Sequence, residues 1–187
     1  MSLLKKCFIV LIALIFIQCG KENQFLIEKG AVGYLNKQTT IQELNSIFKK
    51  DSISSNITDN ILKDKLFTVD TEEFLVFSKE GKKMLEIVPT SQNDSLSKIK
   101  SIQIFDSNYK TEKGISLQST FKEINEHYLV DKVETTLTSA TLFIDELNAT
   151  ISIDKKELGL NSFSREEISI DQIPDIARIK YFTIWFN

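Results

Sequence analysis

Two segments of this chain resemble each other at an offset of 80 residues, and an internal repeat of this kind constrains a fold more than any single motif. The segments are TTIQELNSIF at 39–48 and STFKEINEHY at 119–128. The identical residues are Thr40 and Thr120, Glu43 and Glu123, and Asn45 and Asn125. We therefore expect two similar halves. Chance coincidence in an ordinary α+β chain is the alternative.

Each segment contains the pattern Thr-x-x-Glu, which is a capping box at the start of a helix. The apolar residues behind each box fall three or four positions apart and predict one buried stripe on a short helix. They are Ile41, Leu44, Ile47 and Phe48 in the first segment, and Phe121, Ile124 and Tyr128 in the second. We expect both helices to pack on sheets.

Runs rich in β-branched and aromatic residues follow each helix and predict antiparallel strands. In chain order, the runs are 65–79, 83–88 and 97–105 in the first half, and 132–145, 149–154 and 177–186 in the second. The prediction is an α+β fold of two tandem units, 31–108 and 109–187, each with one helix and a three-stranded antiparallel sheet.

The first residues have the layout of an export signal. Lys5 and Lys6 precede an apolar run at 7–17, which is shorter than the about 20 residues that a spanning helix needs. The junction FIQCGKENQ resembles a bacterial lipoprotein signal, in which cleavage leaves an acylated cysteine as the first residue, although Gln18 is bulkier than the usual preceding residue. The resemblance implies a signal peptide at 1–18. It also implies lipid attachment, palmitate included, at Cys19, and a lipidated tether at 19–30. A poorly processed secretory signal or a short anchor is the alternative.

The composition of the chain argues against some classes of function. A mature chain beginning at Cys19 would keep no second thiol and could form no disulfide, so its core must stabilise it. With 42% hydrophobic residues and 13 Phe, the chain is globular in composition. The net charge is −3, and removing Lys5 and Lys6 makes it more negative, which argues against a nucleic-acid partner.

No catalytic constellation is visible. His127 is the sole histidine, so the mature chain has neither a Cys–His pair nor a His and Cys set for zinc. Motifs for a nucleophile elbow or a phosphate loop are absent from the sequence. The paired carboxylates at Glu72-Glu73 and Glu166-Glu167 are interpreted as solvated surface. Glu72 and Glu73 could not readily share a site, because neighbours on a strand face opposite ways. We predict no enzyme activity, no cofactor and no metal.

The last residues, YFTIWFN, alternate in a way that predicts a two-faced strand. Tyr181 and Trp185 fall on one face, and Phe182, Ile184 and Phe186 fall on the other, which we expect in the core. Tyrosine and tryptophan are enriched at protein interfaces. Tyr181 and Trp185 are therefore the predicted contact surface, and ordinary core packing is the alternative.

Two stretches resemble a family of uncharacterised bacterial envelope proteins: VGYLNKQTTIQELNSIF (32–48) and YKTEKGISLQSTFKEINEHY (109–128). Members share the pattern K-T-x-x-G-I-x-L-x-S/T before a second helix. The matching residues here are Lys110, Thr111, Gly114, Ile115, Leu117 and Ser119. In shape, tandem helix-and-sheet units are similar to the β-lactamase inhibitor protein fold and to the small lipoprotein of the outer-membrane assembly machinery, which both bind proteins.

These resemblances imply a lipid-anchored protein of the bacterial cell envelope, at the periplasmic face or outer membrane, that binds an unknown envelope protein as a scaffold, assembly factor or inhibitor. Because a fold alone does not determine function, two alternatives stay open. One is a ligand-binding lipoprotein with an apolar pocket between the two units. The other is a hydrolase of unfamiliar type.

Overall fold

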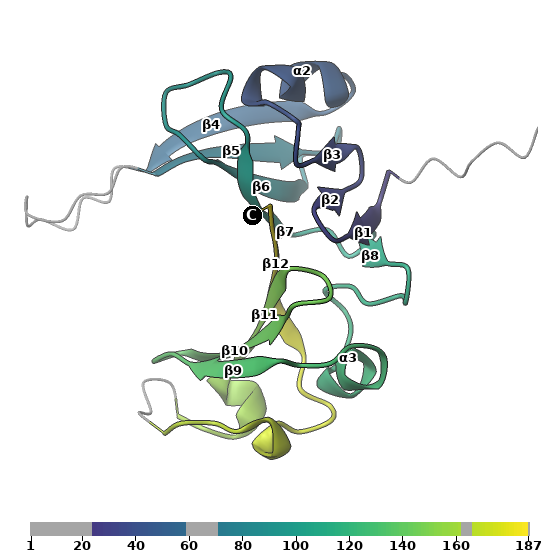
Figure 1. Cartoon of the computed structure of the whole chain (residues 1–187), viewed down its shortest axis with the longest axis vertical. Coiled ribbons are helices and arrows are strands. Elements are labelled where there is room, and N and C mark those ends of the chain that lie inside the picture. Colours follow the sequence, from purple (N-terminus) through teal and green to yellow (C-terminus); the bar gives the residue numbers. More distant parts are fainter. Residues whose placement is uncertain (1–23, 59–70, 162–165, 187) are drawn as a thin grey trace, which may run out of the picture.

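The computed structural model describes residues 24–58, 71–161 and 166–186 (Figure 1). The strands in these ranges are β1 (Leu26–Glu28), β2 (Ala31–Val32), β3 (Leu35–Asn36), β4 (Ser52–Thr58), β5 (Thr71–Phe77), β6 (Lys83–Pro89), β7 (Ile99–Ile104), β8 (Lys110–Thr111), β9 (Lys132–Thr135), β10 (Ser139–Ile144), β11 (Ala149–Asp154) and β12 (Ile179–Trp185). The helical elements are α2 (Leu44–Ile47) and α3 (Phe121–His127), with the 3₁₀ turns η1 (Ile41–Glu43), η2 (Lys155–Leu158) and η3 (Ile170–Gln172). The described fold is mostly β, so the predicted α+β class is wrong.

Eight strands form one continuous sheet in the order β4-β5-β6-β7-β12-β11-β10-β9. Its two halves join where β7 pairs antiparallel with β12, with Ile104 opposite Phe182. The expected pair of separate three-stranded sheets, one in each tandem unit, is therefore also wrong. Each half contributes four strands, and the backbone hydrogen bonds run without interruption from β4 to β9.

Two local features account for the miscounted strands. The segment of β4, SISSNIT, is rich in serine and pairs only with β5, as an edge strand that needs no apolar second face. The run at 132–145 is broken by a tight turn, in which the Thr136 N–H donates to the Ser139 carbonyl at 2.8 Å. The Ser139 N–H donates to Oγ1 of Thr136 at 3.0 Å. Neither glycine, proline nor asparagine marks this turn in the sequence.

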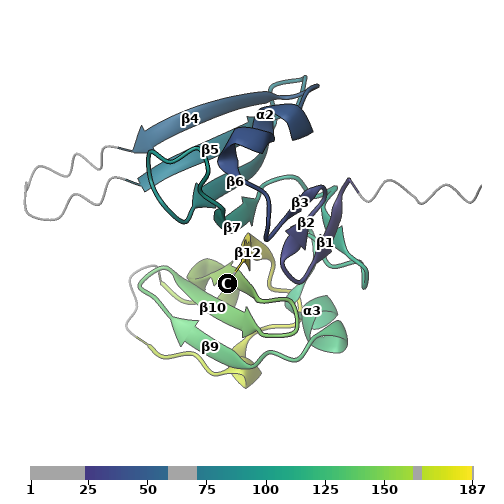
Figure 2. The ribbon, with the colours of Figure 1, turned by 45° about the horizontal axis from the view of Figure 1, so that its top comes forward.

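A small sheet of order β3-β2-β1-β8 lies beside the large one and uses part of the predicted tether. Ile27 in β1 is buried, and β1 pairs antiparallel with β2 and parallel with β8. Strand β1 therefore lies within the segment predicted as a lipidated tether, 19–30, and that tether stays a prediction. Residues 1–23, with the predicted signal peptide and Cys19, lie outside the described ranges. Figures 1 and 2 both show the small sheet between α2 and α3.

The helical segments are shorter than predicted, but their starts agree with the sequence. Both capping boxes are present, and the bonded carboxylate of Glu123 lies 2.7 Å from the Thr120 nitrogen. The first segment is only a 3₁₀ turn and one α-helical turn, because its stripe ends at Phe48. Leu44 and Ile124 are fully buried, and with the inner side chains of both sheets they form one hydrophobic core.

Candidate functional site

One row of side chains crosses the large sheet on the face away from the core. From β4 to β9, strand register places the following residues opposite one another: Ser54, Leu75, Glu86, Gln103, Thr183, Thr150, Phe143 and Lys132. All are half-buried or exposed, whereas their chain neighbours Ile102, Ile151 and Ile184 have 0% exposure. The two faces of the sheet therefore differ, as alternation along strands requires.

We call this accessible side of the sheet the open face. It consists of that row together with Glu73, Lys83, Phe105, Glu134, Asp154, Lys180, Tyr181 and Trp185. Most of these flanking residues alternate in step with the row; Lys83 contacts Glu86 of the row, and Lys180 contacts the flanking residues Asp154 and Tyr181. They come from both halves of the chain, so the open face exists only because β7 and β12 join the halves.

The structure places both predicted contact residues on the open face. Tyr181 is 42% exposed, and Trp185 is half-buried with its indole Nε1 donating to Oγ1 of Thr150 at 3.1 Å. Phe182 and Ile184 are buried in the core, so the predicted alternation of β12 is confirmed. Four positions along a strand separate the two rings by about 13 Å, and they therefore flank the row instead of touching each other.

Three aromatic rings on the open face each make a cation–π contact with a lysine, and each of these lysines also forms an ion pair with a carboxylate. Lys83 lies 3.8 Å from the centroid of Phe105, with Nζ 2.6 Å from Glu86. Lys180 lies 5.3 Å from the centroid of Tyr181, with Nζ 2.8 Å from Asp154. The third set joins Lys132 to the ring of Phe143, at 5.6 Å, and to the carboxylate of Glu134. Each ammonium ion is thereby held over a ring by an opposite charge.

Two of these carboxylates and lysines, and one neighbouring glutamate, have shifted pKa values. The hydrogen bond between Lys180 and Asp154 lowers the pKa of Asp154 and raises the pKa of Lys180. Burial raises the pKa of Glu73, and the nearby charge of Glu86 raises it further, against a smaller effect of Lys83. Glu72 accepts the Asn93 N–H at 2.8 Å and does not share this environment.

A separate hollow of about 660 Å³ lies between the small sheet, the end of α2 and the turn between β5 and β6. Next to it, the carboxylate of Asp106 is buried. Burial favours the neutral form, but the N–H of Asn108 and the ammonium group of Lys82, at 2.9 Å, outweigh it and lower the pKa of Asp106. Burial, together with the charge of Asp106, raises the pKa of Tyr109.

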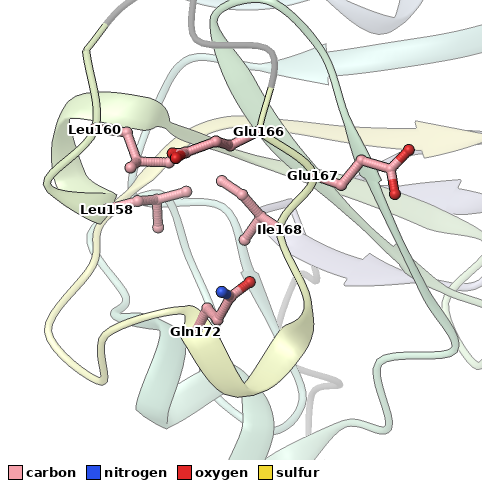
Figure 3. Close-up of a pocket in the computed structure, with 6 residues that line it drawn as sticks. All are labelled: Leu158, Leu160, Glu166, Glu167, Ile168 and Gln172. Atoms are coloured by element: carbon pink, nitrogen blue, oxygen red, sulfur yellow. The ribbon is translucent and has the colours of Figure 1, made fainter.

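Figure 3 shows a smaller hollow of about 380 Å³ at the end of η2. Leu158, Leu160 and Ile168 point toward one another, while Glu167 points away. The carboxylates of Glu166 and Glu167 therefore do not converge into an acid and base pair.

In the part of the chain that the structure describes, His127 is not brought together with other candidate catalytic or metal-binding residues. His127 is exposed on α3, and its backbone carbonyl accepts a hydrogen bond from Nζ of Lys113 at 2.8 Å. Among the described residues there is no cluster of three or more His, Cys, Asp or Glu side chains arranged to hold a metal ion. Within the same ranges, no helix has the length and apolar character that a membrane-spanning segment requires.

Comparison with known proteins supplies a fold relationship. No family model and no curated protein matches the chain. A crystal structure of the uncharacterized protein yfeY from Escherichia coli is similar, with a TM-score of 0.55 and 11% sequence identity, over 85% of this chain and 98% of that chain. At this identity the likeness concerns the fold alone. Membership of the envelope-protein family stays a prediction.

Proposed function

We propose that this chain is a lipid-anchored, non-catalytic protein-binding module of the bacterial cell envelope, and that the open face receives the partner. One observation carries the proposal. The open face holds three aromatic rings, each fixed beneath a lysine that is itself paired with a carboxylate. Side chains already ordered in this way lose less conformational entropy when a partner binds.

The chemistry of the open face favours a protein over other partners. A nucleic-acid surface needs cations free to neutralise phosphates, but Lys83, Lys132 and Lys180 are already paired with carboxylates. An acyl chain needs continuous apolar area, whereas Glu86, Gln103 and Thr183 interrupt the row at its centre. Aromatic groups among balanced charges and hydroxyls are typical of protein–protein interfaces.

Site-specific photo-cross-linking in intact cells tests this proposal. A photoreactive amino acid at Thr183 stands between Tyr181 and Trp185 on the open face, and one at Asn125 serves as a control on the exposed side of α3. We expect a discrete adduct from Thr183 and none from Asn125, and we expect Tyr181→Ala to weaken it. Equal adducts from both positions, or none from Thr183, would contradict the proposal.

Lipid attachment is tested separately by metabolic labelling with a palmitate analogue. Wild-type protein should incorporate the label, and Cys19→Ala should not, because the acyl chains are expected on the sulfur and the amino group of that residue. Equal labelling of the two proteins would refute the anchor. The alternative of an apolar ligand pocket between two units stays a prediction.

A further inference from the structure

The hollow of about 660 Å³ has a composition that the open face lacks. Phe25, Ile47 and Met84 supply apolar side chains to its wall, and Tyr34 at its rim is 48% exposed. Four lysines also line it: Lys49, Lys50, Lys79 and Lys82. Exposed aromatic and cationic side chains beside an apolar surface are characteristic of the interface between membrane and water.

Three of the four lysines are available to an anion. Lys82 is held by Asp106 at 2.9 Å. Lys49, Lys50 and Lys79 are exposed, and none of them makes an ion pair within 4.0 Å with any residue in the described ranges.

Three acidic residues line the same hollow: Asp51, Glu80 and Asp106. Asp106 is occupied by Lys82 and by the N–H of Asn108. Glu80 accepts the hydroxyl proton of Ser78 at 2.7 Å, and a lesser influence of Lys79 helps to lower its pKa. Asp51 is the remaining carboxylate in the wall. The lysines thus outnumber the carboxylates that could compete with a bound anion.

The length of the chain places the hollow near the proposed anchor. Gln24 itself lines the hollow, and it lies only five residues after Cys19 in the chain. Five residues extend by at most about 18 Å, which is less than the thickness of a bilayer leaflet with its headgroups. A chain acylated at Cys19 would therefore keep Gln24, in the wall of the hollow, within about 18 Å of the membrane surface.

We propose that the hollow binds the anionic headgroup of a phospholipid in the bilayer that anchors the chain. Lys49, Lys50 and Lys79 face the phosphate oxygens, and the apolar wall receives the glycerol and first methylene groups. This inference rests on the proposed lipid anchor at Cys19. Figures 1 and 2 show α2 next to the small sheet. Lys49 and Lys50, which follow α2, line the hollow together with Gln24 and Phe25, which precede β1.

Lysine footprinting by mass spectrometry tests the headgroup site in the full membrane-extracted protein. The protein is reconstituted into vesicles of phosphatidylcholine, with or without phosphatidylglycerol, and treated with an amine-reactive reagent. We expect phosphatidylglycerol to slow the labelling of Lys49, Lys50 and Lys79 about fivefold each, from the attraction of a cation near an anionic surface. Lys122, which is exposed on α3, should be unchanged. Equal labelling in both vesicles, or equal slowing at Lys122, would overturn the proposal.

Two further measurements distinguish a failure of the headgroup site from a failure of the lipid anchor. Inorganic phosphate added to phosphatidylcholine vesicles should not protect the lysines from labelling. Protection by phosphate alone would assign the site to free phosphate and overturn the proposal of a headgroup site. The same digest reports the mass of the peptide that carries Cys19. An acylated Cys19 without lysine protection refutes the headgroup site only. An unmodified Cys19 with protection refutes the anchor and leaves the headgroup site standing.

Discussion

Gly33 offers a test of how the turn between β2 and β3 packs against the start of β1. Its φ of +56° is in the left-handed region, and its N–H donates to the Leu26 carbonyl at 2.8 Å. A Cβ at this position would lie 2.3 Å from the carbonyl oxygen of Gln24, which is backbone and cannot rotate away. Gly81 is a matched control, because its φ is +78° but an added Cβ meets no atom within 4 Å.

The two alanine variants should therefore differ in stability. Both place an L residue in the left-handed region, at about 1–2 kcal/mol. Gly33→Ala must also displace the backbone at Gln24 and lose the bond to Leu26, a further ~1 kcal/mol or more. We expect a loss of about 2–4 kcal/mol in the free energy of unfolding for Gly33→Ala and about 1–2 kcal/mol for Gly81→Ala. Urea denaturation followed by the fluorescence of Trp185 measures both. Equal losses would refute the close approach of the β2–β3 turn to Gln24.

Three further predictions concern charge and burial. Because the pKa of Glu73 is raised in the folded protein, its contribution to stability falls as the pH rises above the ordinary value of 4.5. Glu73→Gln should therefore raise the urea midpoint at neutral pH and have no effect well below pH 4.5. A gain of the same size at all pH values would contradict this prediction. The lowered pKa of Asp106 stabilises the fold above pH 3.8, the ordinary pKa, and this stabilisation is lost as the pH falls through the folded-state pKa. Asp106→Asn should therefore lower the free energy of unfolding by about 1–3 kcal/mol at neutral pH and by less in acid. A loss that does not depend on pH would count against the ion pair. In the same urea assay, Ile184→Ala should lower the free energy of unfolding by about 2–5 kcal/mol, and Thr183→Ala should change it by no more than about 0.5 kcal/mol. Similar losses for the two variants would mean that β12 does not separate two faces.

The central strands were predictable because their chemistry is visible in the sequence. In the middle of β7, β11 and β12, isoleucine or phenylalanine occupies alternate positions, and these positions are buried: Ile102 and Ile104, Ile151 and Ile153, and Phe182 and Ile184. The capping boxes at Thr40 and Thr120 were equally visible, because they depend on residues only three positions apart. Local patterns of this kind specify where elements begin and which side they bury.

The pairing between the halves was not predictable from local patterns. Whether β7 pairs with β12 in one sheet or each half closes its own sheet depends on contacts between residues far apart in the chain, such as Ile104 and Phe182. The alternation in both strands is compatible with either arrangement. The expectation of two tandem units failed at this step.

The same reason explains which parts of the candidate site were missed. The position of Tyr181 and Trp185 on one face follows from the period of one strand and was predictable, whereas their contact with a partner stays a prediction. The lysine that covers Tyr181 pairs with Asp154, which is 26 positions away, and Lys83 meets Phe105 on a neighbouring strand. Such sets require the register of the sheet, which composition and periodicity do not supply.

Occupancy of the open face in the cell tests the central claim most directly. Thr183→Cys reports on the open face and Asn125→Cys on the exposed side of α3, and each is labelled by a maleimide in native membranes and after purification. We expect Thr183→Cys to react much more slowly in membranes than when purified, while Asn125→Cys reacts alike in both. Equal rates for Thr183→Cys in the two preparations would contradict a partner bound to the open face.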